Sequence, residues 1–170
     1  MSLPLIIDCD PGVDDAVMLM MALASDTLDV RAITTVAGNV PLRLTSRNAR
    51  MMCQLMNRGD VPVYAGCPGP ILRAPVTAED FHGESGIAGL DPFEPDMPLA
   101  DGHAVTFLVE TLKAAAPGEY TLVVTGPMTN IAAALILDPS IAKGISRLVL
   151  MAGADSAGGN ITPFSEFNVF

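Results

Sequence analysis

The sequence predicts a single α/β domain over residues 1–170, with an open, mostly parallel sheet flanked by helices. Segments of strand length alternate along the chain with longer segments of helical character, an order typical of right-handed βαβ units on a parallel sheet. Half of the residues are hydrophobic, 50% of the 170, which is enough to build a substantial core. No internal repeat, low-complexity tract or linker divides the chain.

Five segments are predicted to be strands, because each is short, apolar and bounded by turn-forming residues. In chain order they are residues 3–8, 28–36, 61–65, 120–124 and 147–151. The second is rich in β-branched side chains, which favour a buried strand of a parallel sheet.

Four segments are predicted to be helices from their length and apolar content. They are residues 14–25, 41–57, 102–116 and 128–137. Their boundaries carry the expected signals: the first begins with two acids, the second begins with Pro41, and the last two are followed by Pro117-Gly118 and Asp138-Pro139. Residues 66–101 are a long connection rich in Pro and Gly, and such loops inside compact domains are usually functional or disordered.

The stretch IIDCDPGVDD places four carboxylates, Asp8, Asp10, Asp14 and Asp15, directly after the first apolar strand. Like charges this close repel one another, and burial would raise their pKa values. A cation is the simplest explanation for so much negative charge at the edge of a core. Carboxylate oxygens suit Ca²⁺ or Mg²⁺, although the spacing does not match an EF-hand loop.

Other polar residues follow the remaining strands. Ligands of open parallel sheets bind outside the carboxyl ends of the strands, so loops from distant parts of the chain should meet the acidic stretch at one edge. The residues expected there are Asn39 after the second strand, Thr125 after the fourth, and Met151, Asn160, Glu166 and Asn168 at and after the fifth.

This edge could hold a metal ion and a sugar. Asp10 and Asp15 could reach one ion, and the carbonyl of Thr125 could add an oxygen. If Asp15 binds through both of its oxygens, the total is about four, fewer than the six to eight of a typical calcium site. Water, substrate hydroxyls or residues outside this chain would supply the rest. A metal can turn bound water into a nucleophile while a neighbouring carboxylate accepts its proton.

Composition excludes several other classes. The formal net charge of −10 argues against nucleic-acid binding, which needs clustered Lys and Arg. The longest apolar run, residues 16–24, is too short to cross a bilayer, so no membrane association is expected. The three cysteines are scattered and form no CxxC pair, which favours a reducing cytoplasmic location over a disulfide framework or a zinc site.

Five stretches together resemble one family. DCDPGVDDAVML, VAGN, HGESGIAGL, VTGPMTNIA and LMAGADSAGGNITPFSEFNVF occur in this order within residues 5–170. They resemble the inosine-uridine-preferring nucleoside hydrolases. The resemblance implies a Rossmann-like core and hydrolysis of the N-glycosidic bond of ribonucleosides to ribose and free base by a calcium-bound water. It also implies Ca²⁺ as cofactor, a role in purine or pyrimidine salvage, and a homodimer or homotetramer.

The same resemblance implies roles for individual residues. For the reaction, the resemblance implies that Asp10 is both a metal ligand and the general base. It implies that Asp15 and the carbonyl of Thr125 bind the metal. It also implies that His82, in the loop bordering the base pocket, is a second candidate catalytic residue. For the sugar, the resemblance implies that Asp14 binds the 2′-hydroxyl and that Asn39 and Asn168 lie near the 2′- and 3′-hydroxyls. It implies that Asn160 and Glu166 bind the 5′-hydroxyl and that Met151 packs near the ribose ring. Asp8 is expected to support the acidic loop.

Members of this family are considerably longer than 170 residues. We therefore expect a partial nucleoside hydrolase that lacks the C-terminal part, where a further metal-binding Asp and the leaving-group acid would lie. Two alternatives stay open. One is an inactive remnant that binds calcium or ribose. The other is a haloacid-dehalogenase-type phosphatase, whose DxD motif Asp8 and Asp10 could mimic.

Overall fold

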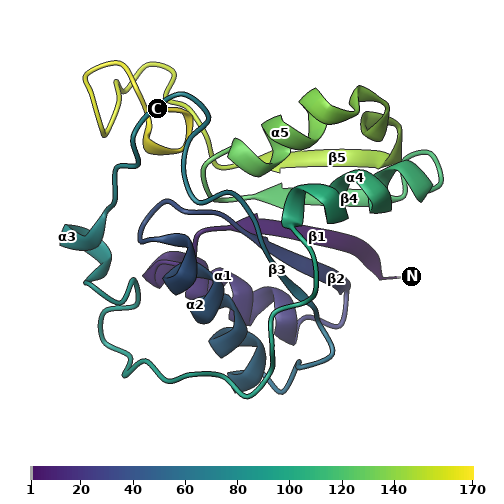
Figure 1. The fold of residues 1–170 in the computed structure, drawn as a ribbon, viewed down its shortest axis with the longest axis horizontal. Coiled ribbons are helices and arrows are strands. Elements are labelled where there is room, and N and C mark those ends of the chain that lie inside the picture. The colour runs from purple at the N-terminus through teal and green to yellow at the C-terminus, as the bar shows by residue number, and fades with distance from the viewer. Residues whose placement is uncertain (1) are drawn as a thin grey trace.

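Five parallel strands form one sheet in the order β3-β2-β1-β4-β5 in the computed structural model, which describes residues 2–170 (Figure 1). The strands are β1 (Leu3–Cys9), β2 (Leu28–Thr35), β3 (Val63–Ala65), β4 (Tyr120–Val124) and β5 (Ile145–Leu150). The chain leaves β1 in one direction through β2 to β3, and then returns to β4 on the other side of β1. This reversal makes a topological switch point between β1 and β4, where open α/β sheets bind their ligands.

Helices cover both faces of the sheet. The elements are α1 (Val13–Ala24), α2 (Leu42–Leu55), α3 (Glu79–His82), α4 (Ala104–Ala114), α5 (Thr129–Leu137), and the 3₁₀ helices η1 (Pro139–Gly144) and η2 (Phe167–Val169). Alternating side chains of β1 supply the two cores: Ile7 packs in a cluster with residues of α1 and α2, and Ile6 packs in a cluster with residues of α4 and α5. The predicted α/β class is therefore confirmed.

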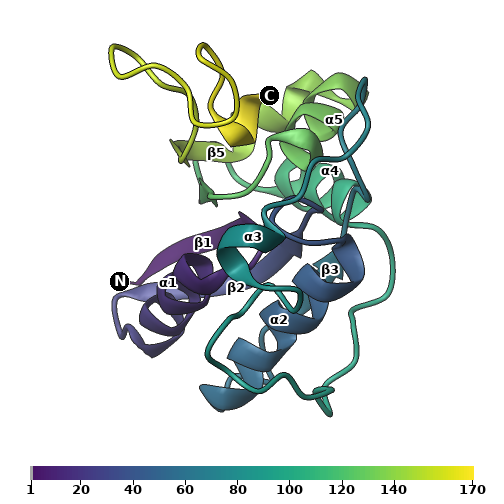
Figure 2. The same ribbon diagram turned by 90° about the vertical axis from the view of Figure 1, so that its left-hand side faces the viewer.

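The predicted strands and longer helices are all present, with ends that shift by a few residues. Sequence patterns missed the short elements, namely α3 within the long connection, η1 after α5 and η2 in the tail. In Figures 1 and 2 the connection from β3 to α4 runs past the outer side of α2 and carries α3. No helix among residues 2–170 has both the length and the apolar character needed to span a bilayer.

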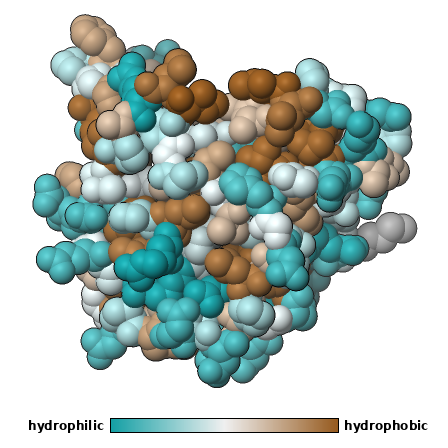
Figure 3. All heavy atoms as spheres, in the orientation of Figure 1, coloured by the Kyte–Doolittle hydropathy of each residue, from teal (hydrophilic) through white to brown (hydrophobic). Residues whose placement is uncertain are grey.

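The outer edge of the sheet is apolar and open. On β5, Leu148 is 42% exposed on one face and Val149 is 45% exposed on the other. No strand among residues 2–170 pairs with the far edge of β5. On α5, Ile136 is 72% and Leu137 is 69% exposed, and Figure 3 shows apolar side chains gathered over this part of the molecule. Edge strands normally carry charges or bulges that prevent pairing, and large apolar patches mark contact surfaces.

We expect this edge to make the 170-residue chain self-associate. The Val149→Lys variant should shift the chain toward monomer, because it places a charge on the apolar strand at the open edge of the sheet. Sedimentation velocity over a concentration series measures the effect. Leu72→Lys is the control, since Leu72 is 93% exposed in a loop and should change little. A monomeric wild-type chain at every concentration would contradict the expectation.

Candidate active site

A cavity of about 410 Å³ lies at the carboxyl ends of the strands. It is lined by all ten residues that the sequence analysis assigned to catalysis, substrate binding or metal binding: Asp10, Asp14, Asp15, Asn39, His82, Thr125, Met151, Asn160, Glu166 and Asn168. The loops after β1, β2, β4 and β5 all contribute, as the topology predicts. The long connection adds further lining residues that sequence reasoning did not name, Thr77, Ala78, Asp80 and Phe81, and the tail adds Ile161 and Phe167.

The floor of the cavity is the acidic turn between β1 and α1. Asp10 and Asp15 are almost fully buried, at 2% and 3% exposure. Oδ2 of Asp10 accepts a hydrogen bond from the backbone N–H of Asn39 at 2.7 Å, and Nδ2 of Asn39 donates to the carbonyl of Asp10 at 3.0 Å. The backbone N–H of Asp10 donates to Oδ2 of Asp15 at 3.2 Å. Asn39 thus holds Asp10 by two bonds, and the other carboxylate oxygen, Oδ1, is left for a ligand.

The electrostatics of this turn favour a cation. Burial raises the pKa of Asp10 well above its usual range, and the nearby charge of Asp15 raises it further. Burial also raises the pKa of Asp15 to about 6. No ion pair within residues 2–170 involves the turn, since the pairs found are Arg31–Asp29, Arg50–Glu94, Arg58–Asp60 and Lys113–Asp138. Within the described chain, the two carboxylates therefore have no cationic partner.

The oxygen atoms in the cavity are of the type that binds a hard cation, but they are too few to complete its coordination. Carboxylate and carbonyl oxygens are the ligands that Ca²⁺ prefers. Among residues 2–170, however, no group of three or more His, Cys, Asp or Glu side chains is arranged to hold a metal. Any ion bound here would need oxygens from water, from a substrate or from elsewhere.

Two glycines shape the wall behind Asp10, and sequence reasoning did not identify them. A Cβ atom built on Gly38 would overlap Oδ2 of Asp10, and one on Gly126 would lie 2.9 Å from Oδ1 of Asp10. The signal was available, because VAGN and TGP each place a glycine just past a strand end. Only a residue without a side chain allows the buried carboxylate to lie there.

We expect Gly38→Ala to displace Asp10 and to lower the free energy of unfolding by about 1–3 kcal/mol, the usual cost of overpacking. Urea denaturation measures the stability. The matched control is Gly59→Ala, because nothing lies within 4 Å of a Cβ at Gly59. Equal effects of the two substitutions would show that contact with Asp10 is not the reason for glycine at position 38.

Asn168 joins the ends of β4 and β5. Its Nδ2 donates to the carbonyl of Thr125 and to the carbonyl of Met151, both at 2.8 Å. Both amide hydrogens are therefore used, and Oδ1 is the atom left to meet a ligand. The Thr125 carbonyl keeps one lone pair free.

Two side chains that the family resemblance assigns to sugar binding, those of Asn160 and Glu166, also form hydrogen bonds that fold the segment after β5. Oε2 of Glu166 accepts from the backbone N–H of Gly153 at 3.0 Å and of Asn168 at 3.1 Å. Oδ1 of Asn160 accepts from the backbone N–H of Phe167 at 2.8 Å. Nδ2 of Asn160 and Oε1 of Glu166 make no such bond and are the atoms that a ligand could reach.

His82 lies in the wall of the cavity. Its Nδ1 accepts a hydrogen bond from the backbone N–H of Val13 at 3.2 Å, at the start of α1. The neutral imidazole therefore carries its hydrogen on Nε2. A Cβ on Gly12 would lie 2.7 Å from Nδ1 of His82, so the loop packs directly on the acidic turn.

Asp8 lies behind the cavity and does not line it. Its Oδ2 accepts from Oγ1 of Thr34 and from Nδ2 of Asn130, the latter at 2.8 Å. Burial raises the pKa of Asp8 to about 7, although these two hydrogen bonds oppose the rise. A buried carboxylate held in this way is not available as the exposed nucleophile that the phosphatase alternative requires.

A doubly wound α/β sheet with an acidic, amide-rich cavity at its switch point defines a protein that binds a small polar ligand, with oxygen donors suited to a cation. The family model for inosine-uridine preferring nucleoside hydrolase matches residues 5–170, and the chain belongs to this family.

Individual proteins and solved structures are also similar to this chain. The chain is 48% identical over 166 residues to an uncharacterised protein of Schizosaccharomyces pombe, covering 98% of this chain and 54% of that protein. It is 45% identical over 170 residues to the pyrimidine-specific ribonucleoside hydrolase RihA of Salmonella paratyphi B, covering 100% and 54%. The solved structure of a purine-preferring ribonucleoside hydrolase from Gardnerella vaginalis matches with a TM-score of 0.90 and 34% identity, covering 97% and 53%. The chain thus spans about half the length of the relatives it matches.

Proposed function

We propose that this chain forms the ribose- and metal-binding half of an enzyme that hydrolyses the N-glycosidic bond of ribonucleosides. The observation that carries the proposal is the acidic cavity, which collects ten candidate residues from loops spread along the whole chain. The named relatives act on pyrimidine or on purine ribonucleosides, so the substrate class proposed is ribonucleosides of either kind.

The sugar would be held by the polar atoms that the fold leaves free. Asp14 and Oδ1 of Asn168 would bind the 2′- and 3′-hydroxyls together with Asn39. Nδ2 of Asn160 and Oε1 of Glu166 would bind the 5′-hydroxyl. Met151 would pack on the ring, with His82 beside the base. The side chains of Asn39, Asn160, Glu166 and Asn168 are already oriented by hydrogen bonds within the loops, so these side chains would lose little conformational entropy on binding.

Asp10 would act as the general base. Its Oδ2 is held by Asn39, and its Oδ1 would accept a proton from the water whose oxygen bonds to C1′ of the ribose. The N-glycosidic bond would break as the C1′–O bond forms, through an oxocarbenium-like transition state, and its electron pair would leave with the base. Asp10, Asp15 and the carbonyl of Thr125 would hold Ca²⁺, which supplies positive charge that lowers the pKa of water and keeps the buried carboxylates ionised.

A second function, binding without turnover, is favoured by one observation. The described residues offer too few side-chain ligands for a complete metal site. A chain with this site alone would bind calcium or ribose weakly and release no base.

The deciding experiment measures ribose release from inosine and uridine by the 170-residue chain, first with Ca²⁺ and then with EDTA. Release that depends on Ca²⁺ supports hydrolysis. Calcium binding by isothermal titration without ribose release supports the binding function. Release that EDTA does not reduce would rule out the metal-dependent mechanism.

A further inference from the structure

A buried amide on α2 joins two loops of the cavity without lining it. Asn48 has no exposed surface. Its Nδ2 donates to the carbonyl of Pro11 in the acidic turn at 3.1 Å and to the carbonyl of Ser85 in the long connection at 2.9 Å. Both donors of one side chain therefore connect segments that are far apart in the sequence.

The side-chain carbonyl oxygen of Asn48 also has defined hydrogen-bond partners. Its Oδ1 accepts from Nε and Nη2 of Arg47 at 3.3 and 3.1 Å, and Nη2 of Arg47 also donates to the carbonyl of Ser85 at 3.2 Å. A buried amide with all these partners is held in one orientation. Its loss would remove the bond to the buried carbonyl of Pro11, whereas Arg47 could still donate to the carbonyl of Ser85.

The loop between His82 and Gly86 is shaped to meet Asn48. Gly83 and Gly86 have φ values of 78° and 82°, which side chains rarely allow. A Cβ on Gly86 would lie 2.9 Å from Nδ2 of Asn48 and 2.8 Å from Cγ2 of Val40. The two glycines therefore let the backbone after His82 turn sharply and rest on α2.

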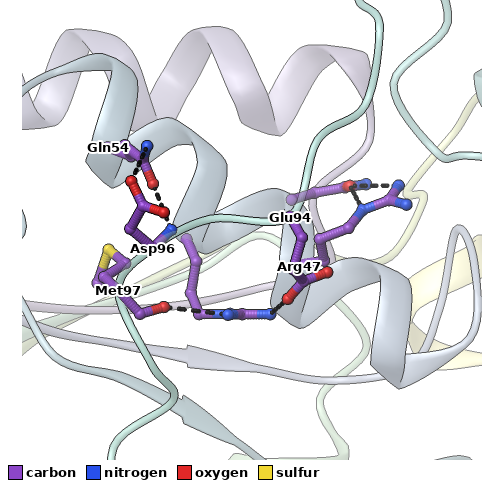
Figure 4. Close-up of polar contacts among 7 residues, drawn as sticks. Arg47, Gln54, Glu94, Asp96 and Met97 are labelled. Atoms are coloured by element: carbon purple, nitrogen blue, oxygen red, sulfur yellow. Dashed lines mark hydrogen bonds and ion pairs between the residues drawn. The ribbon is translucent and has the colours of Figure 1, made fainter.

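Farther along the loop, contacts with α2 are more exposed. Arg50 pairs with Glu94 at 2.7 Å and donates to the carbonyl of Met97 at 3.0 Å, and the side chain of Gln54 accepts from the backbone N–H of Asp96 at 2.8 Å (Figure 4). Pairs that involve exposed partners contribute little to stability. Asn48 itself is fully buried, and its bond to Ser85, three residues after His82, is the contact with α2 best placed to fix the histidine.

We propose that Asn48 is a positioning residue that holds His82 against the acidic turn, by tying Pro11 to Ser85. The catalytic part of this inference rests on the proposed function, since His82 matters there as a neighbour of the base. The geometric part does not depend on it: Asn48 keeps Nδ1 of His82 on the N–H of Val13 and therefore selects the Nε2–H form of the imidazole.

The test of the geometry uses the imidazole nitrogen signals in ¹⁵N NMR spectra. The chain has two histidines, His82 and His103, and Nδ1 of His103 accepts from the backbone N–H of Val105, which provides an internal reference. In the wild type, His82 should show an unprotonated Nδ1 and a protonated Nε2. In Asn48→Ala both signals should move to averaged values, while those of His103 stay in place.

Ser46→Ala is the matched control, because Ser46 is also buried on α2 and its Oγ forms a hydrogen bond with Oγ1 of Thr35, at 2.7 Å, away from the two loops. It should leave the His82 signals unchanged. If Asn48→Ala does not fold, Gly86→Ala tests the same link from the loop side, because its Cβ pushes the loop off Asn48. The proposal is overturned if the His82 signals stay as in the wild type, or if Ser46→Ala moves them equally.

Hydrolysis of inosine and uridine gives the second readout. Asn48→Ala should lower kcat/KM by about tenfold or more, as loss of outer supporting partners commonly does, and Ser46→Ala by less than about twofold. A wild-type chain that releases no ribose refutes the proposed function but leaves the NMR result to decide the geometry. An Asn48→Ala variant with altered His82 signals and full activity would overturn the catalytic part of the inference.

Discussion

The Asp10→Asn substitution is expected to lower kcat for ribonucleoside hydrolysis by at least about a thousandfold, because it removes the proposed general base. The amide keeps the size of the side chain and can still accept the hydrogen bond from the N–H of Asn39, so the fold should survive. The amide cannot take a proton from water, and it gives a bound metal ion one negative charge fewer than the carboxylate does. Steady-state kinetics with inosine and uridine measure the loss.

Calcium titration of the same variant separates the two roles of Asp10. Affinity should fall together with kcat, because one carboxylate of a site with few ligands has been lost. Asp91→Asn is the control, since it removes an exposed carboxylate that does not line the cavity. Normal turnover by Asp10→Asn would show that the base has been assigned to the wrong residue.

Without added metal, the free energy of unfolding is expected to decrease as pH rises from about 5 to about 8. Burial raises the pKa of Asp8 to about 7 and of Asp15 to about 6, so the folded chain binds more protons than the unfolded chain across this range. Stability is lost as these carboxyls ionise, until the pH passes their folded-state pKa values. Ionisation of Asp8 alone should lower the free energy of unfolding by about 2–3 kcal/mol between about pH 5 and about pH 8.

Urea denaturation at a series of pH values measures this slope. Asp8→Asn should flatten the slope, whereas Asp101→Asn, which changes an exposed carboxylate, should not. Added Ca²⁺ should stabilise the protein more at pH 8 than at pH 5, because the ion competes with protons for the same oxygens. A chain that becomes more stable with rising pH in the absence of metal would contradict these pKa directions.

The sequence by itself determined the architecture of the sheet and many of the polar residues that line the cavity. Strand and helix periods, together with the carboxyl-end rule, predicted a parallel sheet and brought Asp10, Asn39, Thr125 and Asn168 to one edge. This works because a strand end is visible in the local pattern, and because parallel strands place all their carboxyl ends on the same side.

Contacts between distant segments were decided only by the tertiary structure. Nothing local to Gly38 shows that Asp10 packs on it, and nothing local to Asn48 shows that it bonds to Pro11 and Ser85. Likewise, periodicity marks β5 as an apolar strand but does not show that it forms an open edge of the sheet. A pattern records the preference of a residue for burial, whereas the partner it meets depends on how the whole chain is packed.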